Sequence, residues 1–397
     1  MDLIVWLGFI LSLVLMVLIA RKNLWLGFFV GAIVLGVFNL SIVQIWQQIA
    51  KTLTTPSTLL MAFAVGIIPL IGGVLETTGM MTALVSNLNI SRKLFLIFGP
   101  AFFGMLPMPG GALLSAPLVF RAGADIPNEQ YAAINVWFRH ALILIYPLGA
   151  LLVTTKIANL NLYTAVLYML PGFILMLILG YFFLLRGVHG KLTTKENPNL
   201  KKILLPIIVI VSAPAIHLSL MTIFPKLMTE IPLIIGVVFS FFLSLFLGKM
   251  NLKKLLPISK KMKPWKFFLI IIGMFLFINI FQASNVSRII ANIVFSRHFL
   301  LIVIGAFLGF VTGRVQMPFA IVLPIYLSTT GFSSIGYLTF ATMFFAIYMG
   351  YIISPIHPCV SVSIEFFGSN LKDFFKKLYP IILISLTAAT VVSLFFT

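Results

Sequence analysis

The sequence predicts an all-α polytopic membrane protein made of two inverted-topology repeats, each with about five transmembrane helices and one re-entrant hairpin. The first observation is composition: 61% of the residues are hydrophobic and only 9% are charged, whereas about 25% of the residues of a soluble domain are charged. The second is that two apolar segments, 94–120 and 299–330, are each interrupted by proline and glycine. The third is that lysine and arginine are concentrated in alternate loops.

Apolar runs bounded by charged or turn residues give the predicted spans. The first repeat, residues 1–185, is expected to contain spans near 3–20, 24–40, 57–75, 131–153 and 162–184. The second repeat, residues 203–397, is expected to contain spans near 203–224, 231–248, 267–283, 335–368 and 378–396. The polar and basic segment 186–202 between them is predicted to be a cytoplasmic linker.

The first re-entrant hairpin is predicted at 94–120. The apolar run from Leu94 to Leu106 has 13 residues, which as a helix extend about 20 Å and cannot cross a hydrocarbon core of about 30 Å. The run is followed by Pro107-Met108-Pro109-Gly110-Gly111, in which proline removes backbone donors and glycine permits non-helical conformations. The chain is therefore expected to turn back inside the membrane and to leave it along 112–120.

A second hairpin is predicted at 299–330, where Gly313-Arg314-Val315-Gln316-Met317-Pro318 interrupts another short apolar pair. Met108-Pro109 in the first hairpin aligns with Met317-Pro318 in the second. Non-helical backbone at membrane depth is tolerated only where protein buries it or where it lines a water-filled cavity. The two tips therefore predict a polar cavity near the midplane, and two such hairpins in two halves indicate a transporter.

The distribution of basic residues predicts the topology. Because each repeat has an odd number of spans, the second repeat enters the membrane with the opposite polarity. If both termini lie outside, 20 of the 27 Lys and Arg residues fall in inside segments and 5 in outside segments, while Arg139 and Arg314 lie within apolar runs. This bias predicts a multi-pass protein of the cytoplasmic (inner) membrane with the N- and C-termini outside. It also accounts for the net charge of +19 without a nucleic-acid partner.

Two of the predicted spans contain an interior proline. Pro147 interrupts the span 131–153, and Pro355 interrupts the span 335–368. An interior proline removes a helical hydrogen bond and clashes with the preceding turn, so both helices are expected to kink or unwind there. The later break, Ser354-Pro355-Ile356-His357-Pro358, is the stronger prediction because two prolines flank one histidine. A plain kink in a packed helix is the alternative at both places.

Arg314 is the most informative single residue. A guanidinium group keeps its charge in proteins, and a charge inside a membrane segment is costly, so an intramembrane arginine is a functional candidate by default. At a hairpin tip it would face the cavity, where the N-termini of half-helices also supply positive potential. The site should therefore favour an anion. The alternative is a structural clamp in which Arg314 pairs with Glu76 or with backbone carbonyl groups.

The candidates for coupling transport to H+ or Na+ are Glu76, Arg139 and His140, together with His357. His140 lies next to Arg139 within a predicted span, and a histidine titrates near physiological pH, so His140 and His357 are candidate proton relays. Glu76 is the acidic residue best placed to carry a proton or to bind a cation. The alternatives are packing or snorkelling for each histidine, and a solvated loop position for Glu76 if its span ends at Gly73.

The hairpin tips and the second break supply the expected substrate contacts, through backbone groups, the charge of Arg314 and neutral oxygens such as that of Ser115. No cofactor and no metal site are expected. The single cysteine, Cys359, excludes a disulfide framework and a four-cysteine metal site and is predicted to be inert packing. The expected substrate-binding residues are Pro107, Met108, Pro109, Gly110, Gly111, Ser115, Gly313, Arg314, Gln316, Pro318, Ser354, Pro355 and His357.

The run Pro107-Met108-Pro109-Gly110-Gly111-Ala112-Leu113-Leu114-Ser115-Ala116-Pro117 resembles the signature of the integral membrane proteins of domain-of-unknown-function family 401. The resemblance covers most of the chain and includes Gly313 to Pro324 and Ser354 to Pro358. That family is grouped with the ion-transporter superfamily, which includes gluconate, citrate and dicarboxylate carriers. The resemblance therefore implies two inverted repeats with hairpins, a homodimer, and transport by an elevator-like movement.

The function predicted from these features is secondary active transport of a small anionic organic solute by alternating access, with membrane lipid as the other partner. The sequence contains no phosphate-binding loop, and no motif of a metalloprotease or a serine hydrolase, so neither ATP coupling nor enzymatic activity is expected. Three alternatives stay open at this stage: a flippase for lipid-linked or isoprenoid phosphates, a channel, and a membrane-embedded enzyme acting on a lipid.

Overall fold

A computed structural model describes residues 2–20, 22–105, 111–122, 126–190, 198–286, 289 and 296–396. The regular elements of these residues are helices. Seven of the described helices are long and apolar enough to cross a membrane, or eight if one bent pair counts as a single span. Many of their large apolar side chains face outward, for example Ile10, Leu167 and Phe242, as expected where lipid surrounds the protein. The prediction of an all-α multi-pass membrane protein is confirmed.

The first half of the chain contains ten helices among the described residues. They are α1 (Asp2–Ala20), α2 (Leu24–Asn39), α3 (Ile42–Thr54), α4 (Pro56–Thr77), α5 (Met80–Ser86), α6 (Arg92–Gly104), α7 (Gly111–Arg121), α8 (Asn128–Ile145), α9 (Ala150–Ile157) and α10 (Leu162–Leu184). Two short helices, α6 and α7, thus occupy the segment of the first predicted hairpin. Its tip residues Pro107, Met108, Pro109 and Gly110 lie outside the described residues.

The second half follows a similar order. Its described elements are α11 (Leu200–Ile223), α12 (Glu230–Leu247), η1 (Leu252–Lys254), α13 (Leu255–Met262), α14 (Pro264–Ala283), η2 (Phe299–Ile304), α16 (Gly305–Thr312), α17 (Gln316–Thr330), α18 (Tyr337–Ile352), α19 (Pro358–Phe367) and α20 (Leu371–Phe396). The second predicted hairpin corresponds to η2, α16 and α17, which turn at 313–315.

Both predicted helix breaks are present. The first span is interrupted between Ile145 and Ala150, so that α8 and α9 meet at 43°. The second is interrupted between Ile352 and Pro358, where α18 ends and α19 begins. Pro147 and Pro355 lie inside these breaks, as expected from the loss of a backbone donor at each proline.

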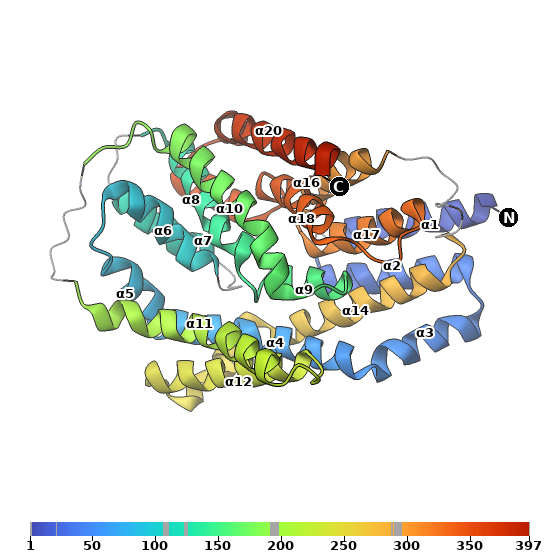
Figure 1. Cartoon of the computed structure of the whole chain (residues 1–397). Coiled ribbons are helices and arrows are strands. Elements are labelled where there is room, and N and C mark those ends of the chain that lie inside the picture. The colour runs from blue at the N-terminus through green and yellow to red at the C-terminus, as the bar shows by residue number, and fades with distance from the viewer. Residues whose placement is uncertain are drawn as a thin grey trace.

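Helix α3 was not predicted, because it lacks a long apolar run. Its first turn has a capping box, in which Ser41 and Gln44 exchange side-chain and backbone hydrogen bonds. Several of its apolar residues, including Val43 and Trp46, are exposed, Ile45 and Ile49 are half-buried, and Thr52 is its buried residue. This amphipathic helix lies along the outside of the bundle, at the right of Figure 1, and packs on α14.

The helices form two groups in contact. In the first, α2 packs against α1 and α14, while α4 packs against α12 and α14. In the second, α6 packs on α8, α16 packs on α18, and α10 touches both α8 and α18. Figure 1 shows α4, α11 and α12 along the lower edge and α20 along the upper edge. The two broken spans belong to the second group, which therefore positions the cavity described next.

Close helix packing in the second group depends on glycine. A Cβ atom at Gly104 in α6 would overlap the carbonyl oxygen of Arg139 in α8. A Cβ atom at Gly309 in α16 would in the same way overlap the carbonyl oxygen of Ile347 in α18. These contacts bring α6 and α16 against the spans that break, as small residues do in membrane helix pairs.

Candidate functional site

A cavity of about 470 Å³ lies where the two breaks and the second hairpin tip meet. Its lining comes from the ends of α6, α8, α16 and α18, from the starts of α7, α9, α17 and α19, and from α4 and α14. Most of the lining is apolar. The polar and ionisable side chains that line it are Arg139, His140, Tyr146, Arg314, Gln316, Tyr348, Tyr351, His357 and Cys359.

Arg314 reaches the cavity because the chain turns sharply just before it. Gly313 has a φ of +60°, a left-handed conformation that glycine adopts without strain. An added Cβ at Gly313 would lie 3.1 Å from the backbone nitrogen of His357 and 3.2 Å from Ser354 Oγ. The second hairpin tip is therefore packed directly against the second helix break.

Ser354 connects these two segments. Its hydroxyl donates a 2.6 Å hydrogen bond to the carbonyl oxygen of Phe310 in α16 and accepts a 3.3 Å bond from the backbone N–H of Ile356. The hydroxyl is thus committed to the backbone of the break and of the hairpin. Ser354 shapes the cavity rather than lining it.

Arg139 lies on α8, and its side chain is 4% exposed. Its Nε and Nη1 atoms are buried and have no hydrogen-bond partner in the described structure. A buried guanidinium without partners is costly, because water solvates the charge well and the protein interior does not. An anion in the cavity would supply the missing acceptors.

His140 is held in one tautomer by the backbone of α8. Its Nδ1 lies 2.6 Å from the carbonyl oxygen of Val136, which can only accept, so Nδ1 carries the hydrogen. Nε2 is then the acceptor and lies 3.3 Å from the hydroxyl of Tyr351. The hydroxyl of Tyr348 donates a 2.7 Å hydrogen bond to the backbone carbonyl of His140. The first break is therefore tied to α18.

His357 lies beside His140, with 4.8 Å between the ring centroids, and beside Tyr351, with 4.2 Å between centroids. It is 2% exposed, and neither ring nitrogen has a hydrogen-bond partner in the described structure. The Sγ of Cys359 completes a group with the two histidines, in which the ligating atoms all lie within 4.8 Å of one another. Cys359 was predicted to be inert packing, but it lines the cavity.

Six of the predicted residues line the cavity together: Gly313, Arg314, Gln316, His357, Arg139 and His140. Four others lie around it. Ser115 is buried in α7 and donates to the carbonyl of Ala112, Pro318 is buried in the first turn of α17, and Ser354 and Pro355 form the second break. Gly111 is the first residue of α7.

Glu76 does not line the cavity. Its Oε1 accepts a 2.8 Å hydrogen bond from Nζ of Lys261 in α13, at the end of α4. The ion pair between Glu76 and Arg314 that was considered as an alternative is not found in the described structure, where Lys261 is the partner of Glu76. The partner is 185 positions away in the sequence, so the sequence reading had no means of identifying it.

The lining also contains residues that the sequence analysis did not select. Tyr348 and Tyr351 lie in the last turns of α18, and Tyr146 lies inside the first break. Their positions could have identified them in the sequence, because each is a hydroxyl-bearing aromatic residue within two turns of a helix-breaking proline. Cys359 follows His357 by two residues, a spacing that is informative only once the break is known.

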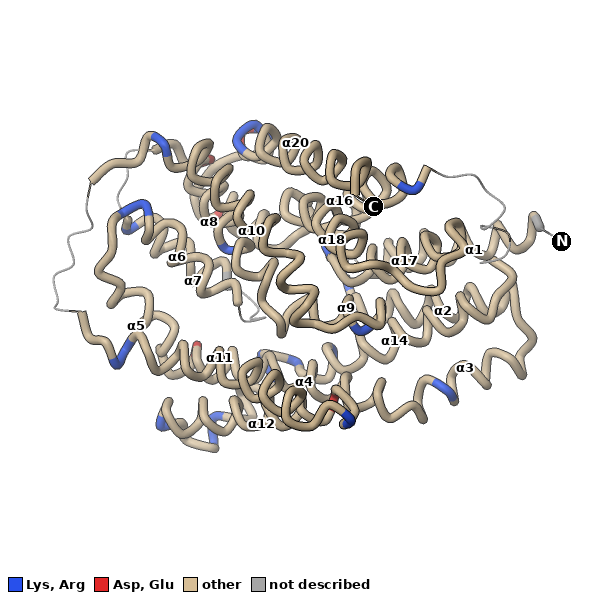
Figure 2. Tube along the Cα trace, viewed as in Figure 1, with Lys and Arg blue, Asp and Glu red and all other residues tan. Residues whose placement is uncertain are grey.

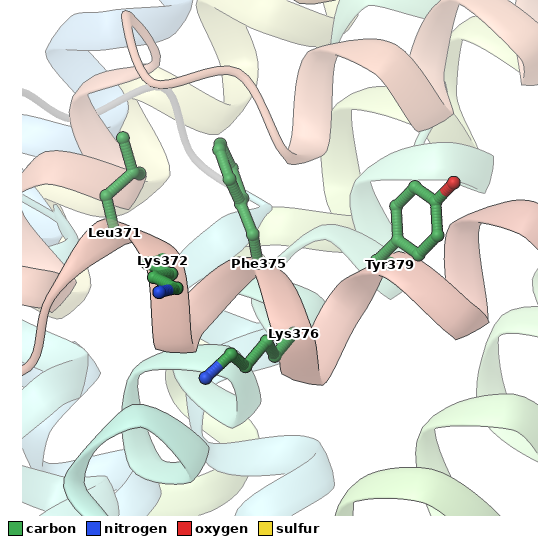
Figure 3. A pocket seen from close by; sticks show the side chains of 5 residues that line it. All are labelled: Leu371, Lys372, Phe375, Lys376 and Tyr379. Carbon is green, nitrogen blue, oxygen red and sulfur yellow. The ribbon is translucent and has the colours of Figure 1, made fainter.

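A second hollow lies on the surface of α20 and is not a comparable site. It is lined by Leu371, Lys372, Phe375, Lys376 and Tyr379, which project from one face of a single helix (Figure 3). Lys376 forms a 2.9 Å ion pair with Asp373 on the same helix. Most Lys and Arg residues lie at the periphery of the bundle (Figure 2), whereas Arg139 and Arg314 line the cavity.

Comparison with known proteins supports the fold. The model of a family described as "Protein of unknown function (DUF401)" matches residues 4–396. The crystal structure of the Alcanivorax borkumensis YdaH transporter, described as having an unusual topology, is 11% identical and superposes with a TM-score of 0.60 over 88% of this chain and 86% of that chain. No curated protein matches the sequence. At this identity the structural likeness shows a shared membrane fold.

Proposed function

The chain belongs to the DUF401 family of proteins of unknown function, and we propose that it is a secondary transporter of a small organic anion, working by alternating access. One observation carries the proposal. Two arginines, Arg139 and Arg314, line a buried cavity in which no described lining residue is acidic. An intramembrane charge without an internal counter-ion is expected to bind a charged ligand of opposite sign.

The chemistry of the two arginines favours a carboxylate. A guanidinium presents paired N–H groups that match the two oxygens of a carboxylate, so each arginine can hold it in a bidentate arrangement. The unsatisfied Nε and Nη1 atoms of Arg139 are free to make such bonds. The side-chain amide of Gln316 and the hydroxyl of Tyr351 add neutral donors to the same lining.

The helix ends around the cavity support both an anion and a coupling cation. The first turns of α9, α17 and α19 line it at Ala150, Gln316 and Cys359, and N–H groups of a first turn have no intrahelical partners and favour anions. The last turns of α6 and α16 line it at Gly104 and Gly313, and their carbonyl groups suit Na+. Coupling to H+ through His140 or His357 is the other proposed mode.

The size of the cavity favours a soluble substrate over a lipid. A cavity of about 470 Å³ lies within the range of about 300–1,000 Å³ typical of small-molecule sites. The lining combines two arginines and three tyrosines with apolar residues, which suits a short carbon skeleton with acidic groups. We therefore place a gluconate-, citrate- or dicarboxylate-sized anion ahead of an isoprenoid phosphate.

The arrangement of the helices is the basis for the proposed movement. The packing of α6 on α8 has its counterpart in that of α16 on α18, and α2 on α14 has its counterpart in α12 on α4. We interpret this as two inverted repeats, 1–185 and 203–397, of the kind found in the ion-transporter superfamily. The proposed movement is an elevator-like displacement of the second group of helices, which holds the cavity. The proposed assembly is a homodimer in the cytoplasmic membrane with both termini outside.

The experiment is a thermal-shift screen of the purified protein against gluconate, citrate, dicarboxylates, amino acids and isoprenyl phosphates, with sodium and pH varied. A ligand that binds the folded state raises the apparent melting temperature by mass action. We expect a carboxylate to stabilise the wild type and not Arg314→Gln, while Arg186→Gln, at an exposed position, keeps the response. Stabilisation by isoprenyl phosphates alone would replace the proposal with a flippase.

A further inference from the structure

We propose that the cavity contains a transition-metal site formed by His140, His357 and Cys359, and that the metal ion and the substrate anion occupy the cavity together. The potential ligand atoms of these three residues all lie within 4.8 Å of one another. They come from the last turns of α8 and from the start of α19. A metal ion bound to them would connect the two broken spans.

His140 has the environment of a metal ligand. A ligating histidine usually donates its other ring N–H to a carbonyl or a carboxylate, which fixes the tautomer and aims the free nitrogen. In His140 the Nδ1 hydrogen is bonded to the carbonyl oxygen of Val136 at 2.6 Å. The lone pair of Nε2 therefore points away from α8, and its hydrogen-bond partner in the described structure is the hydroxyl of Tyr351 at 3.3 Å.

His357 supplies the second, independent observation. It is 2% exposed, and both of its ring nitrogens lack a hydrogen-bond partner in the described structure. Buried polar atoms without partners are uncommon and call for a ligand, an ion or a water molecule. Since the ring of His357 lies edge-on to that of His140, with 4.8 Å between the centroids, an ion between the two histidines would satisfy one of these nitrogens.

Cys359 makes the site selective for soft or borderline ions. It is the only cysteine in the chain, has a free thiol, and is the second residue of α19. Two imidazoles and a thiolate suit Zn2+, Co2+, Ni2+ or copper, whereas Mg2+ and Ca2+ prefer oxygen ligands. In tetrahedral coordination, with metal–ligand distances of about 2.0–2.3 Å, the ligand atoms are about 3.5 Å apart. Side-chain movements of about 1 Å would therefore close the site.

The neighbouring arginines determine what else must bind. Arg139 and Arg314 line the same cavity and repel a cation, so the thiolate of Cys359 and an oxygen of a bound anion have to offset their charge. Three protein ligands leave one coordination position of a tetrahedral ion open, as in catalytic zinc sites. A carboxylate that bridges this position and a guanidinium group satisfies both charges, so metal and anion should each increase the affinity for the other. The inference that metal and anion bind together rests on the proposed function.

The test uses the purified full-length protein with Zn2+ and Co2+ as probes. Because Cys359 is the only thiol, its reaction with a maleimide reports on one atom. We expect Zn2+ to slow this reaction by about tenfold or more, and Co2+ to give a thiolate-to-cobalt charge-transfer band that is absent from Cys359→Ser. Unprotected labelling together with no cobalt band in the folded wild type would overturn the site.

Variants of the two histidines test the ligand set. His357→Gln removes a side chain that makes no hydrogen bond in the described structure, so it should fold and should weaken Co2+ binding by about tenfold or more. His217→Ala is the matched control, because His217 is also buried but is bonded to the hydroxyl of Tyr163, outside the cavity. Equal Co2+ affinity in wild type and His357→Gln would remove His357 from the site.

Two readouts on the wild type separate this proposal from the proposed function. The cobalt band, measured without added anion, tests the metal site alone, and stabilisation by the anion with a chelator present tests anion binding alone. If the cobalt band is present and no anion stabilises the protein, the metal site is supported and the proposed anion transport is contradicted. A Zn2+ affinity that falls in the presence of a stabilising anion would overturn joint occupancy, and an unchanged affinity would overturn the mutual increase in affinity.

Discussion

Charged side chains are handled differently in the cavity and in the rest of the helix bundle. Outside the cavity, Lys156 of α9 pairs with Glu230 of α12, and Lys261 of α13 pairs with Glu76 of α4. Inside it, Arg139 and Arg314 face no acidic residue among the described lining. In these two pairs the chain supplies the counter-charge itself, whereas the described lining of the cavity supplies none for Arg139 and Arg314.

In the Lys156–Glu230 pair, a charge of the chain is matched by an opposite charge of the chain, although Glu230 Oε2 is buried without a hydrogen-bond partner in the described structure. Glu230 is 2% exposed, and its Oε1 accepts a 2.8 Å hydrogen bond from the hydroxyl of Ser57 at the start of α4 in addition to the pair with Lys156. It thereby links α4, α12 and α9. The role of this pair is to hold the two groups of helices together, which differs from that of the arginines.

The largest effect is expected from removing a cavity charge. Arg139→Gln or Arg314→Gln should lower the affinity for the stabilising anion by about 30-fold or more, because truncating one partner of a buried charge pair costs about 2–5 kcal/mol. Isothermal titration of each variant against the wild type is the measurement. Unchanged affinity in both variants would show that the arginines are structural after all.

The next prediction concerns a substitution that gives the cavity an acidic residue of its own. Gln316→Glu places a carboxylate two residues from Arg314 in the same lining, where it competes with the ligand for the guanidinium. We expect an affinity about tenfold lower or more, and a higher melting temperature in the absence of anion, since the unpaired charge is now satisfied. A variant that binds the anion as tightly as the wild type would contradict this.

The third prediction concerns the removal of the acidic charge from the ion pair between Lys156 and Glu230. Glu230→Gln keeps the hydrogen bond from Ser57 but removes the counter-charge of Lys156, whose side chain is 28% exposed. The free energy of unfolding should fall by about 1–3 kcal/mol, less than for a fully buried pair because Lys156 retains contact with water. Thermal denaturation measures the loss, and the anion affinity of the folded protein should not change.

The smallest effect is expected at the more exposed pair. Lys261 is 55% exposed, so Lys261→Gln should change the free energy of unfolding by less than about 1 kcal/mol. The melting temperature and the anion affinity are then both close to those of the wild type. A large loss of anion binding in Lys261→Gln would return Glu76 to the list of coupling residues, because its partner would have been shown to act on the cavity.

Much of this comparison could be predicted from the sequence, for a specific reason. Arg314 and Arg139 are recognisable because a charge within an apolar run is costly wherever the chain places it. The breaks at Pro147 and Pro355 are equally local, since the missing N–H belongs to the proline itself. Length and hydropathy were sufficient for the long spans, which correspond to the seven described membrane helices.

The remaining features depend on tertiary contacts or on weak local signals. Glu76 could be assigned only once Lys261 was known to lie beside it. Cys359 and Tyr351 are residue types that are common in packed helices, and only the approach of the α18–α19 break to His140 groups them. Helix α3 was not predicted because it is amphipathic and has no long apolar run, and apolar residues such as Val43 and Trp46 are exposed on it.

The most direct test of the central claim is uptake of the stabilising anion into proteoliposomes by wild type and Arg314→Gln, with Arg186→Gln as the control. We expect the wild type and the control to take up the anion saturably, and we expect unlabelled anion to compete with this uptake. Arg314→Gln should show no such uptake. Saturable uptake by Arg314→Gln with the same KM as the wild type would contradict the central claim, and so would a wild-type flux that rises linearly with concentration, as in a channel.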